Sequence, residues 1–180
     1  MRRSMWGMFV AAATFAGCSL LGTGGEQVSR TDGPIARGWI KPGDVLRGVE
    51  HARFKERYDT VKVEENLVGM IAQLSEGVDV LVYYGSWCSD SRREVPRFLR
   101  IMEKGGFAED RVRFYALDRS KQSPDGLTQR YGIEMVPTFI FFRDGKEIGR
   151  IVELPKTTLE GDIIEILVAA RAPGGAGHAE

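Results

Sequence analysis

One stretch of the chain decides the fold: Gly85-Ser86-Trp87-Cys88-Ser89-Asp90-Ser91-Arg92-Arg93-Glu94-Val95-Pro96. Residues 78–84 precede it and form a block of β-branched and aromatic residues with the length of a buried strand. After the stretch begins, apolar residues recur at the spacing of one helix face: Val95, Phe98, Leu99 and Met102. The pattern predicts a strand that ends at Gly85, a helix that begins near residues 89–91, and Cys88 at the junction.

A cysteine at that junction suits nucleophilic chemistry. Backbone N–H groups without helical partners and the positive end of the helix dipole both favour a thiolate over a thiol. The thiolate is the attacking species in disulfide exchange. The alternative is that Cys88 is a small buried apolar residue, as free cysteines often are. The polar run after it, Ser89-Asp90-Ser91, favours the reactive interpretation.

A strand, a Trp-Cys pair and a helix with Pro96 eight residues after the cysteine together resemble the thioredoxin superfamily. The run from Tyr131 to Lys146 is similar to that family's approach to its cis-proline, followed by a hairpin that turns at Asp144-Gly145. The resemblance covers roughly residues 64–171. It implies an α/β thioredoxin-like fold, in which a central mixed sheet is flanked by helices, here with an N-terminal extension.

The same resemblance implies the residues of the site. Cys88 would be the nucleophile, and Trp87, Val136 and Pro137 would bind the substrate. The peptide bond before Pro137 would be cis, leaving the Val136 backbone open to an extended peptide. Pro137 in a trans bond at an edge strand is the alternative.

The sequence departs from the redox-active members of the family at three positions. Ser91 stands where they carry a second cysteine, Val82 where they carry a buried acid, and Phe114 at the position of a lysine. We expect the Ser91 hydroxyl, one helical turn from Cys88, to hydrogen-bond to the thiolate. A hydroxyl cannot attack a mixed disulfide, so Cys88 and Ser91 would form a monothiol catalytic pair.

Two functions fit these residues. The first is a monothiol thiol–disulfide oxidoreductase or isomerase acting through Cys88, with protein or small-molecule thiols and disulfides as partners and without a cofactor. The second is a non-catalytic module that holds a peptide or protein in the thioredoxin groove. Nucleic acid is not an expected partner, because 25 basic and 25 acidic residues balance without a basic cluster. A metal site is not expected either, since the two histidines have no helical spacing.

The N-terminus has the pattern of an export signal. A basic start, Arg2-Arg3, precedes an apolar stretch too short to span a bilayer, which takes about 20 residues. Residues 15–18, Phe-Ala-Gly-Cys, resemble the lipobox of bacterial lipoproteins, which makes Cys18 the lipidation site; an ordinary signal peptide cut nearby is the alternative. We therefore expect an exported protein, anchored by lipid on the periplasmic side of the membrane. Ser19 is not acidic and so favours the outer over the inner membrane.

The chain divides accordingly into a signal peptide (1–17), a flexible tether (18–38), a thioredoxin-like domain (39–171, core about 64–171) and a disordered tail (172–180). Within the extension, Asp44 is a candidate helix N-cap, with apolar residues after it on one helix face. His51 in this segment is expected to be a surface or packing residue. Further elements are expected as helices at 63–73, 90–104, 124–131 and 159–170, and as strands at 78–84, 112–117, 139–143 and 147–152.

The lipid anchor predicts the behaviour of a Cys18→Ser variant. Acylated protein should partition into the detergent phase of a membrane extract, because two or more acyl chains anchor a protein stably. Cys18→Ser should remain as precursor or move to the aqueous phase, whereas Cys88→Ser should partition like the parent. Unchanged membrane association of Cys18→Ser would end the lipoprotein interpretation.

Overall fold

The computed structural model describes residues 35–172. The expected signal peptide, Cys18, most of the tether and nearly all of the tail lie outside these residues. A five-stranded sheet in the order β1-β3-β2-β4-β5 is at the centre. Its strands are Gly38–Ile40 (β1), Val78–Tyr84 (β2), Val112–Ala116 (β3), Thr138–Arg143 (β4) and Lys146–Val152 (β5). β2 and β3 are parallel and every other pair is antiparallel, which confirms the mixed α/β sheet.

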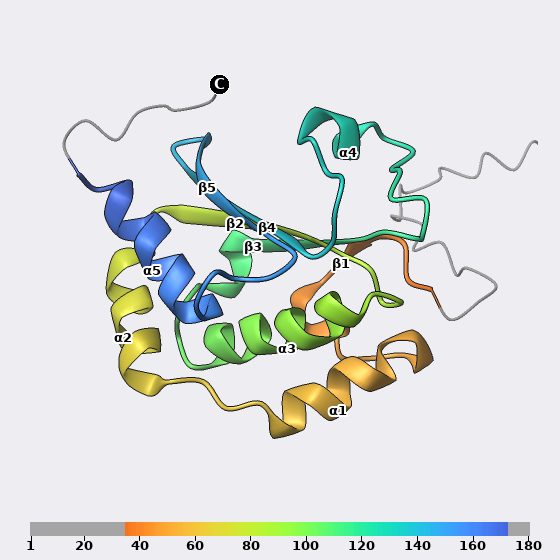
Figure 1. The fold of residues 1–180 in the computed structure, drawn as a ribbon, viewed down its shortest axis with the longest axis horizontal. Helices are drawn as coiled ribbons and strands as arrows, with labels where there is room; N and C mark the ends of the chain where they lie inside the picture. The colour runs from red at the N-terminus through yellow and green to blue at the C-terminus, as the bar shows by residue number, and fades with distance from the viewer. Residues whose placement is uncertain (1–34, 173–180) are drawn as a thin grey trace, which may run out of the picture.

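Most helices lie on one side of this sheet. The helices are Ala52–Thr60 (α1), Glu65–Leu74 (α2), Ser89–Glu103 (α3), Leu127–Arg130 (α4) and Leu159–Ala169 (α5), with short 3-10 turns at Pro42–Asp44, Val49–His51 and Glu109–Arg111. Figure 1 shows α1, α2, α3 and α5 below the sheet and α4 above it. α4 is shorter than the expected 124–131, since Gly126 adopts a positive φ and Leu127 N–H is held by the Asp125 carboxylate.

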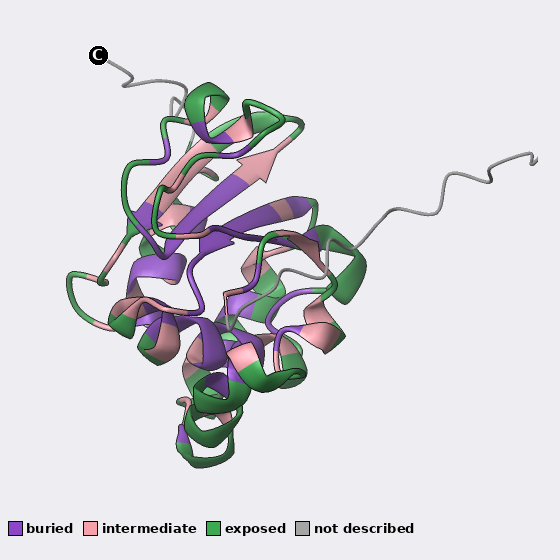
Figure 2. Ribbon diagram, turned by 90° about the vertical axis from the view of Figure 1, so that its right-hand side faces the viewer, coloured by how far each residue is buried: buried purple, intermediate pink, exposed green. Residues whose placement is uncertain are grey.

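The central strand is buried on both faces (Figure 2). Val80, Val82 and Tyr84 face the larger core, which packs against α2, α3 and α5. Leu81 and Tyr83 face a smaller core on the α4 side, with Val136 and Ile140 among its members. A strand covered on both faces reads as a continuous apolar run instead of an alternating one, which explains why the sequence pattern located it so well.

The N-terminal extension differs from the expectation. Gly38–Ile40 pairs with β3 as an edge strand, and Ala36 is buried, so the ordered domain begins before Trp39 and the tether does not run to residue 38. The helix expected to begin after Asp44 starts only at Ala52, because Gly48, at φ +85°, interrupts it. Val49, expected on the buried face of the helix, is 84% exposed.

His51 fastens this extension to the central strand. Its Nε2 lies 2.9 Å from the Tyr84 hydroxyl and its Nδ1 lies 2.8 Å from the Arg47 carbonyl oxygen. Burial lowers the pKa of His51, so the neutral ring donates from Nδ1 to Arg47 and accepts from Tyr84 at Nε2. His51 is therefore a packing residue, as expected. Phe54, fully buried, stacks beside both rings.

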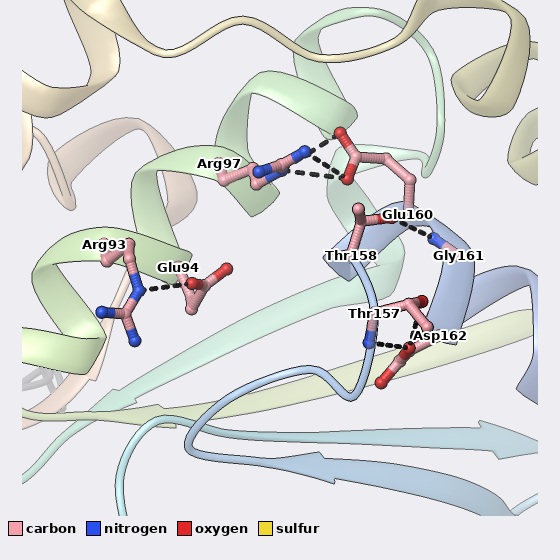
Figure 3. A network of polar contacts seen from close by, with 8 residues as sticks. All are labelled: Arg93, Glu94, Arg97, Thr157, Thr158, Glu160, Gly161 and Asp162. Carbon is pink, nitrogen blue, oxygen red and sulfur yellow. Dashed lines mark hydrogen bonds and ion pairs between the residues drawn. The ribbon is translucent and has the colours of Figure 1, made fainter.

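Helix α3 is held from a second side by α5. Arg97 of α3 forms a two-pronged ion pair with Glu160, which is fully buried at the start of α5 (Figure 3). Such a pair matches a fork of N–H donors to both carboxylate oxygens. Thr158 caps α5 by accepting from the Gly161 N–H. α3 continues through Pro96 to Glu103, so the helix that carries the candidate site is fixed along its length.

Phe54→Ala should destabilise the domain by about 3–5 kcal/mol, because a fully buried aromatic side chain is replaced by a cavity. Urea unfolding followed by circular dichroism measures the change. Val49→Ala is the matched control from the same extension and should stay within about 0.5 kcal/mol of the parent. Equal effects of the two substitutions would contradict the packing described for the extension.

Candidate active site

Cys88 occupies the N-cap position of α3, as the sequence predicted. Its backbone is extended, with φ −82° and ψ 133°, and its carbonyl accepts from the Arg92 N–H in the first helical turn. The side chain is partly buried, and the thiol donates to the Val136 carbonyl oxygen 3.1 Å from Sγ. The loop before β4 and the start of α3 thus meet at the sulfur, although they are 48 residues apart.

The Val136–Pro137 peptide bond is cis, as the resemblance implied. Pro137 is buried, and its carbonyl accepts from the Glu153 N–H at 2.7 Å. The next residue, Thr138, pairs with Tyr83 of the central strand. The Val136 side chain is buried in the smaller core, and its backbone carbonyl is the acceptor of the Cys88 thiol.

Trp87 lies beside Cys88 and is held in place by a hydrogen bond. Its indole N–H donates to the Leu117 carbonyl oxygen at 2.9 Å. A Cβ on Gly85 would lie 2.7 Å from this indole ring, well inside normal contact distance, so only glycine fits at residue 85 without moving the ring. Trp87 remains half-buried.

Ser91 has a different partner from the one expected. Its side chain is fully buried, and its Oγ accepts from the Gly85 backbone N–H at 3.2 Å instead of approaching the Cys88 sulfur. Gly85 lies one residue beyond the last strand pair of β2, so its N–H has no sheet partner and takes the hydroxyl. The hydrogen bond that the structure gives Ser91 is therefore one that holds the turn.

The two positions of the missing proton-transfer groups lie side by side. Val82 of β2 pairs directly with Phe114 of β3, and both side chains are fully buried in the larger core. Apolar packing in the larger core thus stands where a carboxylate and an ammonium would otherwise meet, whereas Cys88 itself packs against the smaller core. A buried carboxylate without a partner would be costly at this place.

Several charged residues flank the site. The sequence did not predict that they would lie together. Asp118 pairs with Arg37 at 2.8 Å, and hydrogen bonds from Ser120 lower the pKa of the Asp118 carboxyl. Asp118 is thus a turn residue. The guanidinium of Arg119 lies over the Trp87 ring, 5.1 Å from its centre. No spacing rule points to these contacts, because they join the extension and the loop after β3 to the site.

Comparison with known proteins decides the family. Residues 47–165 match the family model described as thioredoxin. The chain belongs to the thioredoxin family. A thioredoxin-like protein of Acanthamoeba polyphaga mimivirus is 31% identical over 91 residues, covering 51% of this chain and 64% of that protein, slightly under two thirds of its length. Thioredoxin of Malassezia sympodialis is 32% identical over 88 residues, covering 49% of this chain and 80% of that protein.

A solved structure supports the thioredoxin-like fold over a longer span. A Pseudomonas aeruginosa protein of unknown function superimposes with a TM-score of 0.56 and covers 74% of this chain and 93% of its own, at 16% identity. Within residues 35–172, no helix has the length and apolar character needed to cross a membrane. The same residues contain no group of three or more His, Cys, Asp or Glu side chains that could hold a metal ion.

Ser91→Ala should destabilise the protein by about 1–3 kcal/mol, since it leaves the buried Gly85 N–H without an acceptor. Chemical denaturation of the parent and the variant measures this cost. Ser89→Ala, an exposed serine two residues earlier in the same helix, should change stability by less than about 0.5 kcal/mol. If both serines prove equally dispensable, the Ser91 hydroxyl does not hold the turn.

Proposed function

We propose that this protein is a lipid-anchored monothiol thiol–disulfide oxidoreductase or isomerase that acts through Cys88 on disulfides of exported substrates. The observation that carries the proposal is the contact between the Cys88 sulfur and the Val136 carbonyl beside Pro137. It supports a site in which an attacking sulfur and a backbone edge for an extended substrate lie together. Membership of the thioredoxin family supports the same class of reaction.

The proposed reaction consists of two successive thiol–disulfide exchanges. Cys88 loses its proton to water, and its thiolate attacks one sulfur of a substrate disulfide. A bond forms between Cys88 and that sulfur, the substrate S–S bond breaks, and the second substrate sulfur leaves with the electron pair as a thiolate. A thiol of the substrate or of a small molecule then attacks the Cys88 mixed disulfide and releases the enzyme.

The surroundings of Cys88 support a monothiol mechanism. Ser91 stands one turn along α3 with its oxygen engaged by Gly85, and it is not a thiol. Val82 and Phe114 supply no group to exchange a proton with a resolving thiol. Such a site exchanges one sulfur partner for another, which suits isomerisation or the removal of thiol adducts more than net dithiol reduction.

The buried pair Val82 and Phe114 also favours a second candidate, the non-catalytic binding module. A general base contributes about 10²–10⁴-fold to a proton-transfer step, and this site lacks one. In the second candidate, Trp87 and the Val136 backbone bind a partner, and its capture does not depend on the sulfur. The two candidates therefore differ in whether binding survives the loss of Cys88.

The proposal predicts that the protein accumulates mixed disulfides through Cys88, because no internal thiol resolves them. Non-reducing gels of cell extract should show higher bands that collapse with reductant and are absent from Cys88→Ser. Ser91→Cys should place a second thiol about one turn away and reduce the amount of these adducts. It should also give slow dithiol reductase activity in an insulin reduction assay.

The control is Ser89→Cys, which adds a thiol to the same helix at an exposed position. Its adducts should persist as in the parent. Catalysed exchange that survives Cys88→Ser would overturn the mechanism. Capture of partners that survives Cys88→Ser, with no catalysis by the parent, would establish the binding module instead.

A further inference from the structure

Three cationic side chains border Cys88 without a carboxylate partner among the described residues. Arg119 lies over the Trp87 ring, Lys121 Nζ contacts the Met135 sulfur at 3.5 Å, and Arg92 donates from Nε to the Ser86 carbonyl oxygen. None of the three is neutralised by an ion pair within this part of the chain.

Two of these cations contact residues that adjoin Cys88 and its hydrogen-bond partner Val136 in the chain. Arg119 stacks on Trp87, the residue before Cys88. Lys121 reaches Met135, the residue before Val136, whose carbonyl contacts the thiol. Lys121 has a positive φ of 53°, so the loop between β3 and α4 bends to bring the side chain to this position.

Some of the neighbouring carboxylates are paired with arginine. Arg93 pairs with both Asp90, at 2.9 Å, and Glu94, at 2.8 Å, and Arg37 pairs with Asp118 at 2.8 Å. Asp125 of the loop between β3 and α4, which accepts from the Tyr115 hydroxyl, and Glu134 and Glu153 on the Pro137 side have no ion pair in the described part of the chain and oppose Lys121. Arg92 and Arg119 lie on the Trp87 side instead.

We propose that Cys88 selects disulfides whose flanking groups are anionic, and that Arg119 and Lys121 determine this specificity. The inference rests on the proposed exchange at Cys88 and names the class of its substrate. Carboxylates on either side of a substrate disulfide meet Arg119 over Trp87 and Lys121 beside Met135. The attraction concentrates such substrates at the sulfur and leaves the exchange chemistry itself unchanged.

The test is the rate at which Cys88 forms a mixed disulfide with three small disulfides of different charge. The full chain is used with Cys18→Ser in every variant, so that Cys88 is its one thiol. The probes are dithiobis(nitrobenzoate), a dianion, dithiodipyridine, which is neutral, and cystamine, a dication. Stopped-flow absorbance follows the two aromatic thiols as they leave, and intact-protein mass spectrometry follows cystamine.

Arg119→Gln and Lys121→Gln should each slow the reaction with the dianion about two- to threefold or more at low salt, and the double variant should multiply the effects. The neutral probe should change less than about twofold, which shows that the thiol is intact. The cationic probe should become faster. Raising the salt from about 0.01 M to about 1 M should remove the differences, because the screening length falls from about 30 Å to about 3 Å.

Arg113→Gln is the matched control, because Arg113 is also an exposed arginine over an indole ring, 5.6 Å from the centre of Trp39. Leu117 is the residue whose carbonyl binds the Trp87 indole, and Arg113 lies four residues before it, roughly 13 Å farther along the strand. Substitution of Arg113 should therefore leave all three rates unchanged. Arg119→Lys should retain the rate with the dianion.

The outcomes separate the inference from the proposed function. If Cys88 reacts with all three probes and Arg119→Gln and Lys121→Gln slow none of them selectively, the charge specificity is wrong and the exchange mechanism stands. If Cys88 reacts with none of the probes, the proposed function itself fails.

Discussion

The Gly85 N–H lies directly after the last residue of the central strand and has no partner in the sheet, and the site depends on how it is satisfied. The Ser91 hydroxyl accepts from it across the turn and so ties the first turn of α3 to the end of β2. Cys88 lies between these two anchor points. Its position relative to Val136 follows from that hydrogen bond and from the pairing of β2 with β4 on the other side. A buried polar group at residue 91 thus serves the geometry of the site, whatever its part in the chemistry.

Apolar residues stand at the two positions where redox-active members of the family carry proton-transfer groups. Val82 and Phe114 pair across β2 and β3 and are buried in the larger core, which favours stability and leaves no acid or base at these positions. The charges near Cys88 lie instead at the surface, on Arg92, Arg119 and Lys121. A surface charge can attract or repel a partner, but it is too well solvated to substitute for a buried proton carrier.

The N-terminal extension acts on the same strand from outside the core thioredoxin unit. His51 bonds to the Tyr84 hydroxyl, one residue before Gly85, and Phe54 packs against the same ring. Arg100 of α3 stacks on Tyr58 of α1, with its guanidinium carbon 3.9 Å from the ring centre. The extension therefore supports both the strand and the helix that meet at Cys88, which gives residues 38–60 a structural role in the site.

Local sequence patterns were enough to predict the helices and strands whose apolar residues follow a single helical or strand period. The apolar run at 78–84, the helix face after Cys88 and the Asp144-Gly145 turn located β2, α3 and the hairpin of β4 and β5, because strand burial, helix periodicity and turn chemistry are all local. The motifs around Cys88 and Pro137 also indicated that these two residues would meet. The three-residue strand β1 escaped detection, since Gly38-Trp39-Ile40 is too short for a period and is held only by its pairing with β3.

The sequence by itself determined the family, the central strand and helix, the position of Cys88 at the start of that helix and the absence of a second thiol at residue 91. Only the tertiary structure decided which partners the polar groups take. Ser91 bonds to Gly85, His51 to Tyr84 and Arg119 to the Trp87 ring, and each contact joins residues whose approach depends on how β2, β3 and α3 pack. Hydrogen bonds and ion pairs require separations of a few ångströms, and such separations between distant residues are set by the packing of the whole domain, not by local sequence.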